Sequence, residues 1–143
     1  MSKTWLLAAA LLLVGCGKEV GRVPFSGEGS GSATTVLNAG SVAFWTDVDI
    51  AYDGSATLDY QIALVQGGTR VASAVCNPLG PMSIQVLWNE MHRGSASWRS
   101  GRGKMDCSAN LSKGGPTTVE ATLAFGDRPL SATIKRADLV VKQ

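Results

Sequence analysis

The stretch Val42-Ala43-Phe44-Trp45-Thr46-Asp47-Val48-Asp49-Ile50-Ala51-Tyr52 decides the fold class of this chain. Its even positions are mostly apolar, whereas its odd positions include Asp47 and Asp49. A period of two is typical of an antiparallel strand with one buried face. The same alternation recurs over residues 57–64, 104–111 and 118–125. The pattern predicts an all-β domain.

Turn-forming residues separate the alternating segments. Gly or Pro residues occur in segments 53–54, 67–68, 78–81, 114–116 and 126–129. Tight connections between strands are expected there. No window after residue 16 has the 3.6-residue period of an amphipathic helix. We therefore predict an antiparallel β-sandwich, or a flattened barrel, of about seven to nine strands over residues 34–143.

The register of the strands can be predicted in part. A two-residue turn at Gly67-Gly68 places Val71 and Val75 on the core face of the strand that follows. A five-residue loop around Asp53-Gly54 makes the two flanking strands neighbours in one sheet and keeps their acidic residues from facing each other. The apolar parity changes within the last strand, which predicts a bulge near Lys135-Arg136.

Length and composition limit the classes of protein. The chain has 143 residues and a formal net charge of +2, with 17% charged and 45% hydrophobic residues. This length supports one domain and excludes a two-domain enzyme with a separate cofactor fold. The composition argues against intrinsic disorder. A net charge this small argues against general nucleic-acid binding.

The first sixteen residues have the layout of an export signal. Lys3 precedes an unbroken apolar run of ten residues, 5–14, which ends in Leu13-Val14-Gly15-Cys16. Ten residues make about 15 Å of helix, roughly half of a bilayer core, so the run suits a signal segment better than a lasting membrane span. The tetrapeptide resembles the lipobox of bacterial lipoproteins. The alternative is an ordinary secretory signal in which Cys16 is incidental.

The lipoprotein resemblance implies a cellular location for the mature chain. Residues 1–15 would be a signal peptide, and Cys16 would carry acyl chains on its sulfur and its amine, with the lipid bilayer as a partner. Gly17, where such proteins can carry Asp, favours the outer membrane. Residues 16–33 would be the lipidated cysteine and a flexible Gly/Ser-rich tether. The resemblance thus implies an exported protein that is lipid-anchored in the cell envelope.

Two cysteines remain once Cys16 is acylated. Cys76 and Cys107 would lie in an oxidising compartment, and an even number there predicts a disulfide that closes a loop of about 30 residues. The alternative is a pair of buried free thiols. The strand pattern raises one difficulty, because Cys107 has inward parity and Cys76 has outward parity. A bridge at a strand end would resolve it.

The residues offer little for catalysis. His92 is the only histidine, and neither a serine elbow nor paired zinc-binding histidines accompany it. We expect a solvated loop histidine, no enzymatic activity and no cofactor.

Four acids, Asp47, Asp49, Asp53 and Asp59, occur where the chain has no Lys or Arg between residues 22 and 70. The favoured interpretation is a solvated acidic sheet face. The alternatives are a Ca²⁺ site formed by Asp47, Asp49 and Asp59, or an acid/base pair of a small hydrolase.

The opposite charge gathers in residues 91–105. These residues contain no acid, and Trp98 lies among the cations Arg93, Arg99, Arg102 and Lys104. Arg and Trp are enriched at binding hot spots, so the segment is a candidate partner-binding loop. The alternative is a polar hairpin tip with Trp98 folded onto the core.

Trp45 has outward parity beside Asp47. It is either a second exposed aromatic or a residue covered by the N-terminal segment or by the parity switch at residues 135–136.

The expected function is therefore binding. The leading hypothesis is an anchored lipoprotein whose β-domain binds an envelope protein or glycan, in a scaffold, assembly or adhesion role. The second is an inhibitor that blocks the acidic cleft of a wall-degrading enzyme with its basic loop. The third is a small hydrolase that uses the acidic cluster. Nucleic acid is not expected as a partner, because the resemblance implies an exported protein.

Overall fold

The computed structural model describes residues 17–143, so the predicted signal peptide and Cys16 lie outside the described residues. Nine strands form in this range: β1 (Glu19–Val23), β2 (Gly29–Leu37), β3 (Gly40–Asp53), β4 (Leu58–Gln66), β5 (Thr69–Cys76), β6 (Met82–Arg93), β7 (Ala96–Leu111), β8 (Gly115–Phe125) and β9 (Ser131–Lys142). No helix that could span a membrane occurs among these residues.

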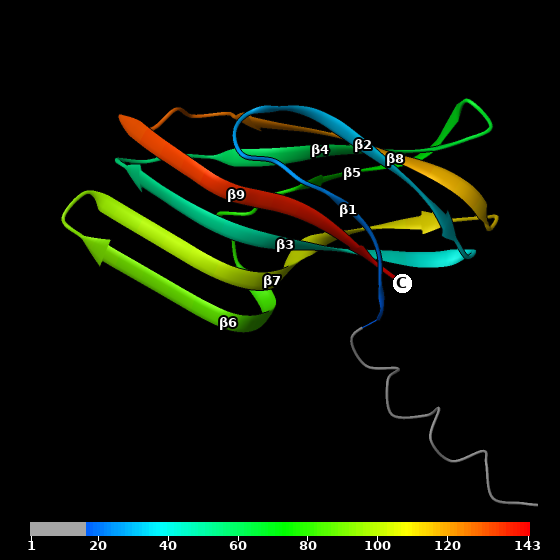
Figure 1. The fold of residues 1–143 in the computed structure, drawn as a ribbon, viewed down its shortest axis with the longest axis horizontal. Helices are drawn as coiled ribbons and strands as arrows, with labels where there is room; N and C mark the ends of the chain where they lie inside the picture. The colour runs from blue at the N-terminus through cyan, green and yellow to red at the C-terminus, as the bar shows by residue number, and fades with distance from the viewer. Residues whose placement is uncertain (1–16) are drawn as a thin grey trace, which may run out of the picture.

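The strands form two antiparallel sheets packed face to face (Figure 1). The five-stranded sheet has the order β1-β9-β3-β7-β6, and the four-stranded sheet has the order β2-β8-β4-β5. β3 lies at the centre of the five-stranded sheet and pairs with β7 on one side and β9 on the other. The predicted β-sandwich is confirmed.

The core lies between the inward faces of the two sheets. β3 contributes Phe44, Val48 and Ile50, and β4 contributes an unbroken alternation from Leu58 to Leu64. These side chains are the apolar members of the period-two patterns, so the sequence identified the core faces of β3 and β4 correctly. Hydrophobic burial on this scale is the main stabilising term of the fold.

One buried polar contact sits inside this core. The hydroxyls of Tyr60 and Thr46 lie 2.8 Å apart, and Thr46 Oγ1 also donates to the carbonyl of Asp138 at 3.2 Å. Burial raises the pKa of Tyr60 above its ordinary value. The contact satisfies polar atoms that would otherwise be costly to bury, and it joins the two sheets.

The expectation of a flexible tether before residue 34 is wrong for the described part of that segment. β1 pairs with β9, and β2 pairs with β8 along nine residues. The glycines permit close approach between strands here: a Cβ on Gly31 would lie 2.9 Å from Cγ1 of Val23. The sandwich therefore begins at Glu19 and not at residue 34.

The predicted hairpin at Asp53-Gly54 is also wrong. β4 belongs to the four-stranded sheet, where its partners are β8 and β5. The chain crosses from one sheet to the other after Asp53, and Gly54 N donates to the carbonyl of Ser95 at 2.9 Å. A change of sheet gives the same alternation as a hairpin, because both keep one face of each strand in the core.

The β4–β5 register differs from the predicted one by a single residue. A bulge between Leu64 and Val65 sets Leu64 opposite Ala72, so Val71 and Val75 face solvent instead of the core. A one-residue shift reverses the faces of every later residue in the strand. Cys76 consequently faces inward and is buried.

The same bulge removes the difficulty with the disulfide. Cys76, at the end of β5, bonds to Cys107 in β7 and links the two sheets, as predicted from the cysteine count. The predicted bulge in the last strand is confirmed as well: Asp49 pairs with Arg136 and Ile50 with Ile134, which leaves Lys135 as the extra residue.

Removal of the disulfide should destabilise the domain without changing its fold. The two cysteines are 31 residues apart, so the double variant Cys76→Ser/Cys107→Ser should lose about 3–4 kcal/mol of unfolding free energy. Urea denaturation followed by tryptophan fluorescence measures this loss. An unchanged midpoint would show that the bridge contributes nothing to stability.

Candidate functional site

The outer face of the five-stranded sheet carries the odd-numbered residues of β3. Asp47 on β3 and Asp138 on β9 are direct cross-strand partners, and each residue is only 8% exposed. Like charges in this position destabilise a sheet unless cations neutralise them.

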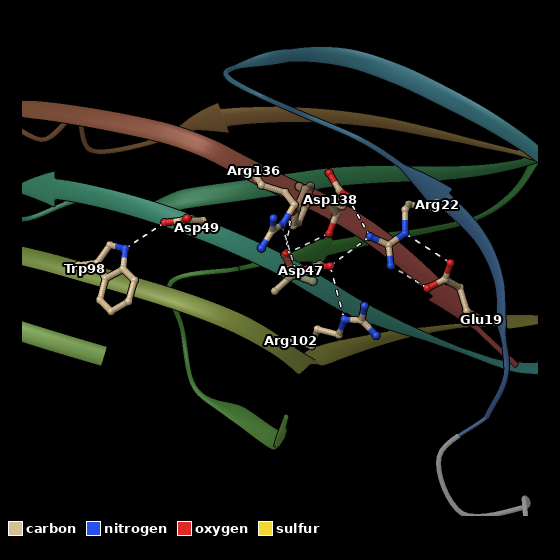
Figure 2. Close-up of polar contacts among 10 residues, drawn as sticks. Glu19, Arg22, Asp47, Asp49, Trp98, Arg102, Arg136 and Asp138 are labelled. Atoms are coloured by element: carbon tan, nitrogen blue, oxygen red, sulfur yellow. Dashed lines mark hydrogen bonds and ion pairs between the residues drawn. The ribbon is translucent and has the colours of Figure 1, made fainter. Parts of the chain in front are cut away.

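Arginines from three strands neutralise the two carboxylates (Figure 2). Nη1 of Arg22 donates to Oδ2 of Asp47 at 3.2 Å and to Oδ2 of Asp138 at 2.9 Å. Nε of Arg136 donates to Oδ1 of Asp47 at 3.1 Å, and Nε of Arg102 lies 3.5 Å from Oδ2 of the same residue. The predicted solvated acidic face is therefore wrong, because a mixed ion-pair network occupies this surface.

Glu19 completes the network. Arg22 donates to Glu19 through Nη2 at 2.8 Å and through Nε at 3.4 Å. These bonds lower the pKa of Glu19, and the same carboxylate is the main cause of the raised pKa of Arg22. Arg22 thereby connects β1, β3 and β9, and each of its three side-chain nitrogens has a carboxylate partner.

The structure does not bring together the residues of the calcium hypothesis. Asp47 and Asp49 share the outer face of β3, as predicted, but Asp59 lies on β4 in the other sheet. Within residues 17–143 no cluster of three His, Cys, Asp or Glu side chains could hold a metal ion. Asp47, which the hydrolase hypothesis paired with a second acid, is held by Arg22 and Arg136.

The predicted basic loop is a hairpin whose side chains point to both faces. Residues 91–105 span the end of β6, a turn at Gly94-Ser95 and the first part of β7. Arg102 and Lys104 pair with outward-facing residues of β3, whereas Arg99 pairs with the buried Ile50. The cations therefore do not form one patch.

The side chain of Arg99 is bonded to other parts of the domain. Its Nη1 donates to the carbonyls of Pro78 at 3.1 Å and Gly80 at 2.9 Å. Its Nη2 lies 2.8 Å from Glu90, and its guanidinium stacks 5.2 Å from the centre of the Trp88 ring. Arg99 thus holds the β5–β6 loop against the hairpin.

Trp98 lies on the outer face and is half-buried. Its Nε1 donates to Oδ1 of Asp49 at 2.9 Å. His92, predicted in a loop, lies near the end of β6, where it is exposed and its Nδ1 is 3.0 Å from Oγ of Ser97. The bond to Asp49 fixes the indole in place, so Trp98 is a preorganised part of the surface.

A shallow groove crosses the outer face at the end of the sheet nearest the β6–β7 turn. Its lining includes Met91, Trp98, Ala51 and Thr133, which form one row across four strands, with Arg93 and Asp53 in the next row. We call this feature the distal groove. In Figure 1 the β6–β7 turn lies at the left of the molecule, and the C-terminus lies well to its right.

β6 borders the distal groove and is an edge strand. Among residues 17–143 it pairs only with β7, and its other edge has no strand beside it. Leu87 and Met91 are 83% and 63% exposed, and Val86 is exposed as well. Sequence reasoning missed this edge, although the apolar run Val86-Leu87-Trp88 interrupts the alternation there.

Trp45 is covered, which is one of the two alternatives that the sequence left open. It is 3% exposed, and Nζ of Lys142 lies 3.9 Å from the centre of its ring. Glu19 and Arg22 of the N-terminal strand line the same depression. Trp45 is therefore not a second exposed aromatic.

The chain has no match in the comparisons with known proteins: no protein-family model, no curated protein and no solved structure is significantly similar to it. The case for a function therefore rests on the surfaces described above and on the lipobox resemblance.

Loss of the hydrogen bonds from Arg22 to Asp47 and Asp138 should destabilise the five-stranded sheet. Arg22→Met keeps the aliphatic stem but leaves Asp47 and Asp138 facing each other, so the unfolding free energy should fall by about 2–3 kcal/mol. Chemical denaturation measures the loss, and adding Asp138→Asn should recover part of it because one like charge is removed.

The matched control is Arg128→Met. Arg128 pairs with Glu28 at 3.1 Å, but its side chain is largely exposed, so the loss should stay below about 1 kcal/mol. Equal losses for the two variants would contradict a special role for Arg22.

Proposed function

We propose that the protein is a lipid-anchored lipoprotein of the bacterial outer membrane whose β-domain binds an extended segment of another envelope protein. The observation that carries the proposal is the bare edge of β6 with its exposed apolar side chains, next to the distal groove. An edge strand of this kind is a template for pairing with a further strand.

The β6 edge offers both parts of strand recognition. Its backbone groups can give the ladder of hydrogen bonds, and side chains on alternate positions can give selectivity. A bulge lies between Val86 and Asn89, and from Asn89 to Arg93 the pairing with β7 is regular. The stretch 89–93 is therefore the part best suited to receive a strand.

The chemistry of the surroundings describes the partner segment. Met91 and Trp98 favour apolar side chains, and Arg93, with Arg102 and Lys104 farther along the face, favours acidic ones. Asp53, in the groove lining, adds one carboxylate whose Oδ1 is buried without a hydrogen-bond partner within residues 17–143. We infer an extended segment that alternates apolar and acidic residues.

The geometry near the N-terminus suits an anchor. Lys18 and Gln143 exchange two backbone hydrogen bonds, each of 3.1 Å, so only Gly17 separates Cys16 from the strand ladder. An acyl group on Cys16 would hold this part of the sandwich at the bilayer. β7 has 16 residues and is about 50 Å long, so the distal groove would be displayed far from the lipid.

The inhibitor hypothesis has less support. It requires the cations to gather in one accessible loop, whereas Arg99 is bonded to two carbonyls and lies on the opposite face of the hairpin from Arg102 and Lys104. The groove and the edge strand remain the better basis for binding.

Acylation is tested by the mass of the protein purified from its own cells. The expected mass is that of residues 16–143 plus two or three acyl chains, and the variant Cys16→Ser should accumulate with its signal peptide uncleaved. A mature N-terminus without lipid would remove the anchoring part of the proposal.

The binding edge is tested by photo-crosslinking in the intact envelope. A photo-reactive residue in place of Met91 should yield a crosslinked partner protein, and Leu87→Asp in the same chain should reduce the yield because it puts a charge on the apolar edge. The control is the same probe at Val36, an exposed apolar residue on the other sheet. Equal adducts from positions 91 and 36, or none from 91, would reject β6 as the docking site.

A further inference from the structure

A small depression on the outer face of the five-stranded sheet lies in the half nearest the N-terminus. Its volume is about 120 Å³, and its lining comprises Glu19, Arg22, Trp45, Thr46, Arg102, Val140 and Lys142. These residues come from β1, β3, β7 and β9. The depression is distinct from the distal groove, with which it shares no lining residue.

The hydrogen-bond donors of this depression outnumber its acceptors. Trp45 is 3% exposed, and its Nε1 has no hydrogen-bond partner. Arg102 is 58% exposed, and its one carboxylate contact within residues 17–143 is the 3.5 Å approach of Nε to Asp47. Nζ of Lys142 lies over the Trp45 ring, and no carboxylate of the described chain lies within 4.0 Å of it.

The acceptors nearby are already used. Both carboxylate oxygens of Glu19 accept bonds from Arg22. Oδ1 of Asp47 accepts from Arg136, and Oδ2 accepts from Arg22. A buried indole N–H normally has an acceptor, so the N–H of Trp45 is a donor that an acceptor from outside the described chain can use.

We propose that this depression binds a phosphate group, and that the phosphate is a lipid headgroup of the membrane that holds the anchor. Three cations line the depression; the nitrogens of Arg22 are all bonded to carboxylates, so Arg102 and Lys142 supply the charge that would hold an anion. The planar guanidinium of Arg102 has its two terminal nitrogens available to phosphate oxygens, and Arg is suited to bidentate phosphate contacts. For the same phosphate to reach the buried indole N–H of Trp45, the side chain of Lys142 would have to move from the face of the ring.

The choice of a headgroup depends on the proposed function, because it uses the anchor. Glu19 is three residues after Cys16, and three extended residues span at most about 10 Å. An acylated Cys16 would therefore place the depression at the level of the lipid phosphates. The headgroup contact would be a second, electrostatic attachment that fixes the rotation of the domain on the bilayer.

The test follows the indole N–H of Trp45 by NMR in the purified mature protein. Trp45→Phe assigns the signal among those of Trp45, Trp88 and Trp98. The signal should shift in nanodiscs that contain phosphatidylglycerol, and less in nanodiscs of phosphatidylcholine alone. Arg102→Gln and Lys142→Gln should each weaken the response by about tenfold, which corresponds to about 1.4 kcal/mol. Arg128→Gln, which removes an exposed cation elsewhere, should not change the response.

A titration with inorganic phosphate distinguishes a lipid headgroup from a free phosphate ligand. A Trp45 shift with inorganic phosphate but with neither lipid would mean a free phosphate ligand and would overturn the headgroup assignment. No shift with phosphate or with either lipid would overturn the site. A chain that proves unacylated by mass would refute the anchor alone, since the phosphate titration reports on the depression without it.

Discussion

Two carboxylates face each other across the β3–β9 ladder, and the arginines around them decide how the N-terminal part of the chain is used. Asp47 and Asp138 are almost fully buried and would repel each other without Arg22, which donates to both. Because Arg22 comes from β1, neutralising the pair requires that β1 join the sheet. The segment from Glu19 onward is therefore part of the sandwich, so the proposed lipid anchor would be attached directly to the folded domain.

The two ends of the domain consequently differ: one contains the paired N- and C-terminal residues, and the other contains the distal groove. At one end, the backbone of Lys18 pairs with Gln143, and the Gln143 side chain bonds to both backbone groups of Asn38 at 2.6 and 2.7 Å. At the other end lie the β6–β7 turn and the distal groove. In the proposed function, the first end would lie at the lipid and the second would face other envelope components. A short connection of this kind would restrict the orientation of the domain and so reduce the conformational entropy lost on binding.

The β6–β7 hairpin is stiffened by residues that looked like binding residues in the sequence. Arg99 donates to the carbonyls of Pro78 and Gly80 in the β5–β6 loop. The Cys76–Cys107 bridge attaches β5, the strand before this loop, to β7. Trp98 is fixed by its bond to Asp49. These contacts restrain the hairpin beside the β6 edge, and a preorganised edge would reduce the ordering cost of the strand pairing proposed above.

The sequence by itself determined which residues face the core in most strands, with β5 as the exception, that Cys76 and Cys107 form a bridge, and that the last strand has a bulge near Lys135-Arg136. Each of these follows from local parity or from counting. Only the tertiary structure decided which strands are neighbours. Period two specifies the faces of a strand but not its partner, so the change of sheet after Asp53 looked like a hairpin, and a Gly-rich segment whose partner strands lie about 90 or more residues away looked like a tether. The candidate sites escaped the sequence for the same reason: Asp47 meets its arginines, and β6 becomes an edge, only when distant strands are placed side by side.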